Sequence, residues 1–183
     1  MSRASENSLG VVAGITFCLC VLFGVGYLVG AWLQGISFEQ NCRGYLKRAA
    51  DANTVVRARD ELEKAIKFMD SNDLTKGSTH IFYVTPDCDV EYWYGNIKDS
   101  YDELVEFPSD ADHLTTSNQL MKLRETLLDD AGGEQGGVEV TCPPRIEFYP
   151  NQTLWWWGGF FATIAAMVGA LAGSITSAIF FKN

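Results

Sequence analysis

Two long runs without a charged residue constrain this chain more than any other feature. Leu9–Leu33 has 25 residues and Leu154–Phe181 has 28, and neither contains Asp, Glu, Lys or Arg. At about 1.5 Å per helical residue, each run is longer than the roughly 30 Å hydrocarbon core of a bilayer. The pattern predicts an integral membrane protein with two transmembrane helices and excludes a soluble single-domain enzyme. A disordered chain is also excluded, because 13% of the residues are aromatic.

The first run differs from a cleavable signal peptide. Its apolar stretch is about twice the usual length of a leader's apolar region, and no A-x-A-like cleavage site follows it. We therefore expect an uncleaved signal-anchor helix, with removal of the run as the alternative. The expected organisation is a tail (1–8), a first span (9–34), an extramembrane domain (35–153), a second span (154–181) and a tail (182–183).

The charge of the middle segment bears on partners and location. Residues 35–153 carry 12 basic and 22 acidic side chains, a net charge of −10. This acidity opposes binding to nucleic acid or to anionic lipid. We expect both termini in the cytoplasm and residues 35–153 on the outer side of an inner or plasma membrane. The basic cluster Arg43, Lys47 and Arg48 favours the opposite orientation, and long loops cross largely regardless of charge.

Apolar residues in the middle segment recur at three- and four-residue steps, the spacing of amphipathic helices. They predict helices over about 38–69, 87–107 and 110–130. Residues 138–150 read as extended chain, because two consecutive prolines disfavour a helix there. The fold class is therefore all-α: two transmembrane helices flank a helical bundle, with a short extended segment before the second span.

Small and aromatic residues in the two runs indicate how the spans pack and where they end. Small side chains at four-residue spacing allow close backbone approach in lipid, and tryptophans favour the headgroup layer. The candidate helix-packing residues are Gly26, Gly30, Ala165, Gly169, Gly173 and Ser177. The candidate membrane-interface residues are Trp32, Trp155, Trp156 and Trp157.

Reactive and metal-binding patterns are sparse. The middle segment has three cysteines and no C-x-x-C, so the sequence supports neither a zinc knuckle nor a thioredoxin-like pair. A disulfide between Cys88 and Cys142 is the marginal choice; three reduced thiols or a link between chains are the alternatives. His80 and His113 are each isolated in the sequence, which favours structural roles. We expect no catalytic, cofactor-binding or metal-ligating residues.

An aromatic cluster is the most distinctive candidate for recognition. Tyr92, Trp93 and Tyr94 are consecutive in the second predicted helix. Since Trp93 lies on its apolar face, Tyr92 or Tyr94 must point elsewhere and is a candidate partner contact. Packing within the bundle is the competing interpretation.

Several segments carry a resemblance to a known group. They are KRAADANTV at 47–55, TPDCDVEYWYGN at 85–96, SNQLMKLRETLLD at 117–129 and YPN before the second run. They resemble uncharacterised two-span membrane proteins of cyanobacteria, other bacteria and phages, a resemblance that implies no activity and no functional residues. The span–bundle–span order is also similar to the sensor half of helical-bundle chemoreceptors, although the expected two-residue tail would leave no signalling domain.

The sequence therefore predicts a non-enzymatic membrane protein. Its extracytoplasmic bundle would act as a sensor-like, scaffold or accessory subunit through contacts with lipid, with copies of itself or with a membrane-protein partner. The alternative function is a homo-oligomeric channel, to which each protomer would contribute two helices.

Overall fold

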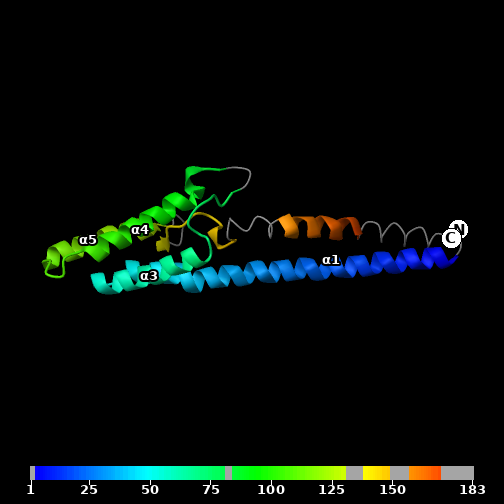
Figure 1. Ribbon diagram of the computed structural model, residues 1–183, viewed down its shortest axis with the longest axis horizontal. Helices are drawn as coiled ribbons and strands as arrows, with labels where there is room; N and C mark the ends of the chain where they lie inside the picture. Colours follow the sequence, from blue (N-terminus) through cyan, green and yellow to red (C-terminus); the bar gives the residue numbers. More distant parts are fainter. Residues whose placement is uncertain (1–2, 81–83, 131–137, 149–156, 170–183) are drawn as a thin grey trace. The chain divides into compact units, whose positions relative to one another are not determined.

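The computed structural model describes residues 3–80, 84–130, 138–148 and 157–169 and is mostly helical (Figure 1). It divides into an apolar unit, residues 1–33 and 152–183, and a helical domain, residues 34–151. In chain order the elements are α1 (Arg3–Phe38), the π-helical turn η1 (Glu39–Arg43), α2 (Gly44–Ala50), α3 (Val55–Ser71), the 3-10 turn η2 (Pro86–Cys88), α4 (Val90–Glu106), α5 (His113–Leu127), β1 (Leu128–Asp130), β2 (Val138–Val140) and the 3-10 turn η3 (Ile146–Phe148). A further apolar helix covers Trp157–Gly169.

The prediction of one continuous helix over 38–69 is wrong. The chain leaves the helical conformation at Asp51, and α3 begins after Thr54, whose hydroxyl accepts a hydrogen bond from the Arg57 backbone N–H at 3.3 Å. Helix α3 then packs along α2 and reaches η1, so α2 and α3 form a hairpin. Two short helices that face each other satisfy the same apolar spacing as one long helix, and they bury that face without a further partner.

The other predicted helices differ from the structure mainly at their ends. Helix α4 occupies most of 87–107 and begins after Asp89, whose carboxylate accepts hydrogen bonds from the Glu91 and Tyr92 backbone N–H groups at 2.9 and 3.1 Å. These bonds satisfy donors that a helix start leaves open. Helix α5 begins after Asp112 and ends at Leu127 rather than continuing to residue 130.

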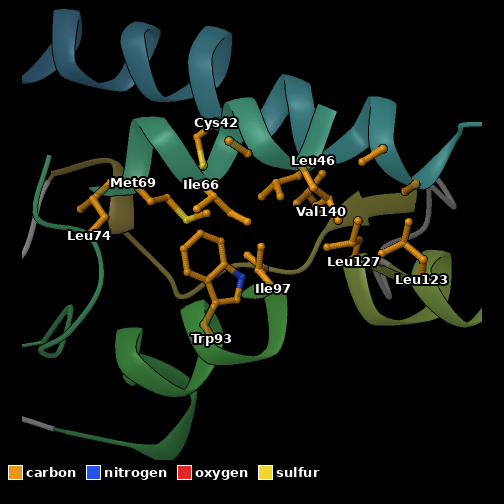
Figure 2. Packing of buried hydrophobic residues seen from close by; sticks show 14 of the residues in the cluster. Cys42, Leu46, Ile66, Met69, Leu74, Trp93, Ile97, Leu123, Leu127 and Val140 are labelled. Carbon is orange, nitrogen blue, oxygen red and sulfur yellow. The ribbon is translucent and has the colours of Figure 1, made fainter. Parts of the chain in front are cut away.

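A short antiparallel ladder corrects the all-α expectation. Leu128 pairs with Val140 and Asp130 with Val138, so β1 and β2 form a two-stranded sheet. Three-residue strands are too short to show a period-two pattern in the sequence. The ladder returns the chain to the bundle, where Val140 is buried beside Leu127 (Figure 2).

Several helices of the helical domain contribute buried side chains to one core. Leu46 of α2, Ile66 and Met69 of α3, and Trp93 and Ile97 of α4 meet at its centre (Figure 2). Each fully buried aliphatic side chain contributes about 1.5–3 kcal/mol relative to an exposed one. This packing fixes the position of α4, and therefore of the turn that precedes it.

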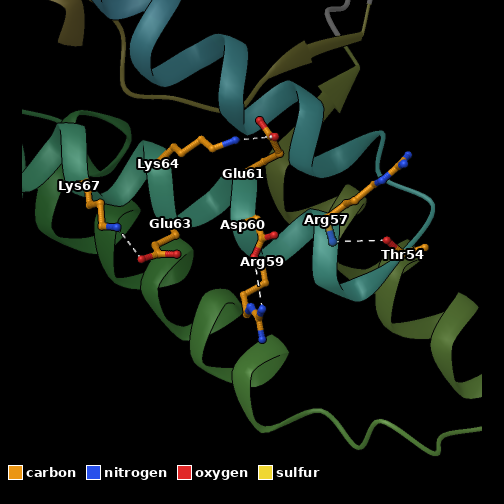
Figure 3. A network of polar contacts seen from close by, with 8 residues as sticks. All are labelled: Thr54, Arg57, Arg59, Asp60, Glu61, Glu63, Lys64 and Lys67. Atoms are coloured by element: carbon orange, nitrogen blue, oxygen red, sulfur yellow. Dashed lines mark hydrogen bonds and ion pairs between the residues drawn. The ribbon is translucent and has the colours of Figure 1, made fainter.

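Ion pairs connect charged residues of α3 to one another and to α2. Lys67 pairs with Glu63 at 2.6 Å, one turn apart, and Lys64 pairs with Glu61 at 2.9 Å (Figure 3). Arg48 of α2 reaches the same Glu61 oxygen at 2.9 Å. Glu61, the buried charged residue of the described core, is therefore held between two cations from the two helices of the hairpin.

The apolar unit exposes the residue types that the helical domain buries. The helical stretch Phe17–Ala50, which continues from α1 into α2, is long and apolar enough to cross a membrane by length and composition. A signal sequence near an N-terminus satisfies the same criteria. Within the described residues, Trp157–Gly169 is too short to be a clear span, and the second span therefore stays a prediction.

Candidate functional site: an acidic groove beside a buried thiol

The turn that precedes α4 is held to an upstream segment by backbone hydrogen bonds. Gly77 adopts a φ of 101°, a conformation that favours glycine, and its carbonyl accepts from the Val90 N–H at 3.0 Å. Ser78 and Asp89 form an isolated antiparallel bridge. The Thr79 N–H donates to the Cys88 carbonyl at 3.1 Å. These contacts place residues 77–80 directly against residues 88–90.

A groove opens beside this turn. Its volume is about 650 Å³, within the usual range for small-molecule sites. The Trp93 indole N–H donates to the Thr141 carbonyl at 2.6 Å and so joins α4 to the segment after β2. The groove is lined by Pro86, Asp87, Asp89, Tyr92, Trp93, Asn96, Asp129, Thr141, Cys142, Pro143 and Pro144.

The groove carries negative charge from aspartates. Asp87 and Asp129 are exposed, and in the described part of the chain neither has an ion-pair partner. Asp89 is engaged as the cap of α4. Asp87 and Asp129 are therefore the carboxylates available to a cation in the groove.

Cys88 lies next to this groove, between Asp87 and Asp89. Its sulfur is 2.7 Å from His80 Nδ1 and 3.1 Å from Thr85 Oγ1. Hydrogen bonding from Thr85, with a smaller contribution from His80, lowers the pKa of Cys88 to about 7. A thiol of this kind is substantially ionised at neutral pH.

The disulfide between Cys88 and Cys142 that the sequence favoured is not formed in the structure. Both residues are free cysteines, as is the buried Cys42. An Arg43 guanidinium N–H donates to the Cys142 sulfur at 3.3 Å. Burial nevertheless raises the pKa of Cys142, since desolvation outweighs the attraction of Arg43. Cys88 and Cys142 therefore have contrasting environments.

The two candidate tyrosines, Tyr92 and Tyr94, lie on different faces of α4 and differ in exposure. Tyr92 is 67% exposed and lines the groove, so its ring is available to a ligand. Tyr94 packs against the core, and its hydroxyl donates to Asp70 at 2.7 Å. Burial and this bond raise the pKa of Tyr94 to about 12. Tyr92 is the better candidate for a partner contact, and Tyr94 has a structural role.

Two of the candidate helix-packing residues, Gly26 and Gly169, are not at the close approach that the structure describes within the apolar unit. A side chain added at Gly26 or Gly169 would meet nothing within 4 Å, whereas a Cβ at Gly159 would overlap the Tyr27 ring. The sequence analysis missed Gly159, which adjoins the Trp triplet. Gly30 and Ala165 lie on described helices, Gly173 and Ser177 lie outside the described residues, and the role of the whole set stays a prediction.

The candidate interface tryptophans are described only in part. Trp32 is 66% exposed on α1, and Trp157 stacks on Phe161 at a centroid distance of 5.9 Å. Trp155 and Trp156 lie outside the described residues. Among described residues, no three His, Cys, Asp or Glu side chains are grouped as metal ligands would be.

Comparison with protein-family models, curated proteins and solved structures gave no match. The resemblance to two-span bacterial and phage proteins therefore stays a prediction. The candidate site rests on the geometry of the chain alone.

Sequence reasoning missed the contact between His80 and Cys88, and it treated His80 as isolated. The two residues are eight positions apart and meet only because the segment 77–80 pairs with the α4 turn. One local signal was present: Thr85 and Cys88 flank a proline at a three-residue spacing that suits a tight turn.

Proposed function

We propose that this chain is a membrane-anchored, sensor-like binding protein rather than an enzyme, and that its groove binds an organic cation. The cation is an ammonium or guanidinium group, carried by a free amine or by a basic peptide of a membrane-protein partner. The observation that carries the proposal is the groove itself, where Asp87 and Asp129, without ion-pair partners among the described residues, lie in the same lining as the exposed Tyr92 ring. Scaffold and accessory-subunit roles are versions of this proposal in which the partner is a protein.

The anchoring part of the proposal is supported by α1. From Leu19 to Leu33 its large apolar side chains are mostly exposed, and in water such a continuous surface would be unfavourable. A bilayer removes this cost because its interior is as apolar as the side chains. We place α1 across an inner or plasma membrane, with the termini cytoplasmic and the helical domain outside.

The cation specificity is supported by charge and by ring chemistry. Asp87 and Asp129 lie on two of the three sequence segments that border the groove, and neither has an ion-pair partner among the described residues. The face of the Tyr92 ring attracts a cation through its quadrupole. The net charge of −10 on residues 35–153 draws cations toward the domain and repels anions.

The test is a titration of the full chain in detergent micelles. Ethylguanidinium serves as the small-molecule ligand, and a tetra-arginine peptide with blocked ends serves as the peptide ligand. We expect saturable binding that weakens with salt. The peptide should bind more tightly if the natural ligand is a protein segment, and the two should bind equally per guanidinium if it is a small molecule.

The matched variants are Asp87→Asn with Asp129→Asn in the groove, and Asp110→Asn on an exposed loop away from it. Each groove substitution should weaken binding about threefold to tenfold, the range for a partly exposed charge contact. Absence of saturable binding by either ligand would contradict the proposal. Equal losses in Asp110→Asn would contradict it too, since they would reflect net charge alone.

A further inference from the structure

We propose that Cys88 is a site of oxidation by small hydroperoxides such as hydrogen peroxide, with His80 as the proton acceptor and Thr85 as a hydrogen-bond donor to the sulfur. This inference is independent of the groove and holds whether or not the groove binds a cation.

The contact geometry suits a nucleophilic thiol. His80 Nδ1 lies 2.7 Å from the Cys88 sulfur, within reach of its proton, and a thiol beside a base of this kind reacts as the thiolate. The Thr85 hydroxyl, 3.1 Å from the sulfur, donates to the resulting thiolate. Both groups therefore favour the form of Cys88 that attacks an electrophile.

The arrangement is held by the backbone. The Cys88 N–H donates to the Thr85 carbonyl at 3.0 Å, and the Cys88 carbonyl accepts from the Thr79 N–H at 3.1 Å. The Thr79 side chain also contributes a hydrogen bond that lowers the pKa of the Cys88 thiol.

The residues that cover the Cys88 sulfur limit how large an oxidant can reach it. Cys88 is 2% exposed, but Val84, Pro86, Asp87 and Asp89 are all exposed, so the thiol lies directly beneath the surface. A bulky disulfide cannot approach a sulfur that is covered in this way. Hydrogen peroxide, which is little larger than water and has polar atoms at both ends, needs only a small local opening.

The proposed reaction converts the Cys88 thiol and hydrogen peroxide into a sulfenic acid and water. The Cys88 thiol proton moves to His80 Nδ1, and the thiolate attacks one peroxide oxygen. An S–O bond forms as the O–O bond breaks, and the departing hydroxide takes the proton back from the imidazolium to leave as water. The sulfur loses two electrons and the peroxide gains them, so a thiol and hydrogen peroxide give a sulfenic acid and water.

The helical domain contains its own controls. Cys142 is half-buried and lines the groove, and this partial burial raises the pKa of its thiol, whereas Cys42 is completely buried in the core. Neither has a histidine contact among the described residues. If oxidation followed the mere presence of a thiol, all three residues would react alike.

The experiment treats the full chain in detergent micelles with hydrogen peroxide at pH 7, traps sulfenic acid with dimedone and locates the adduct by peptide mass spectrometry. We expect Cys88 to be tagged at least about tenfold faster than Cys142, which reflects its larger thiolate fraction. His80→Gln and Thr85→Val should each slow tagging at Cys88 severalfold, and Cys88→Ser should remove that adduct. Far-UV circular dichroism identifies variants that keep the fold.

Two results would overturn the proposal. In the first, Cys88 of the folded wild-type chain is tagged no faster than Cys142. In the second, Cys88 is tagged preferentially, but at a rate that Thr85→Val and His80→Gln leave unchanged in folded protein. Two variants are included so that failure of one to fold leaves the other to decide.

Discussion

Leu28 in α1 is 68% exposed, whereas Leu62 in α3 is completely buried, and the same contrast separates Trp32 from Trp93. The apolar unit and the helical domain use the same residue types in opposite ways. In the helical domain, the core is made of apolar side chains that pack against one another, and most charged side chains face outward. In α1 the apolar side chains face outward along the helix. The difference is what the proposed membrane anchor requires, because lipid would cover the apolar surface of α1 that water would not.

The largest expected difference in stability is between two leucine-to-alanine substitutions, one in each unit. Leu62→Ala should destabilise the helical domain by about 3 kcal/mol, because it leaves a cavity that the core only partly closes. Leu28→Ala should change the unfolding free energy of that domain by less than about 0.5 kcal/mol. Urea unfolding in micelles, followed by circular dichroism, measures both. Equal losses would remove the distinction between the two units.

A smaller effect separates the two tryptophans. Trp93→Phe removes the indole donor that reaches the Thr141 carbonyl at 2.6 Å and should cost about 1–2 kcal/mol. Trp32→Phe, on exposed α1, should cost almost nothing. The same unfolding experiment in micelles measures both. An unchanged stability in Trp93→Phe would contradict the assigned role.

A third comparison uses two threonines. Thr54 caps α3, and Thr54→Ala should destabilise the helical domain by about 1 kcal/mol. Among the described residues, the Thr163 hydroxyl donates to the Phe160 and Gly159 carbonyls of its own helix, so Thr163→Ala should have little effect on the helical domain. The same unfolding experiment measures both. A Thr163→Ala loss as large as that of Thr54→Ala would mean that the units do not unfold separately.

The smallest expected effect is a loss of stability of the helical domain at low pH. Hydrogen bonding with Lys122 lowers the pKa of Glu103, and hydrogen bonding with Thr115 lowers the pKa of Asp112. Since both pKa values are lower in the folded state than in the unfolded state, their stabilisation is present at neutral pH and is lost as the pH falls through the folded values. Glu103→Gln and Asp112→Asn should each flatten the decline in melting temperature below about pH 5. A decline unaltered by either substitution would rule out these groups as its source.

The sequence alone was enough to predict those features that depend on local patterns. The apolar run in α1, the start of α4 near Pro86 and the apolar face that includes Trp93 follow from composition, capping and spacing. The hairpin was not predictable in the same way, because residues 51–54 interrupt a spacing that is unchanged on either side. The sheet of β1 and β2 was hidden by the shortness of its strands.

The candidate site was less predictable than the fold. Exposure of Tyr92 could be inferred from the position of Trp93 on its helix. The groove could not, since Asp87 and Asp129 are 42 positions apart and are brought together by the return of the chain through β2. The His80–Cys88 contact depends on a single isolated bridge, for which no residue pattern exists.

The central claim, that α1 holds a folded helical domain at a membrane, is most directly tested by alkaline carbonate extraction of membranes from cells that make the full chain, followed by intact-mass measurement of the pelleted protein. The account predicts that the chain stays in the membrane pellet at its full mass of 20.3 kDa. Recovery in the soluble fraction, or a product shortened by removal of the N-terminal apolar run, would contradict it.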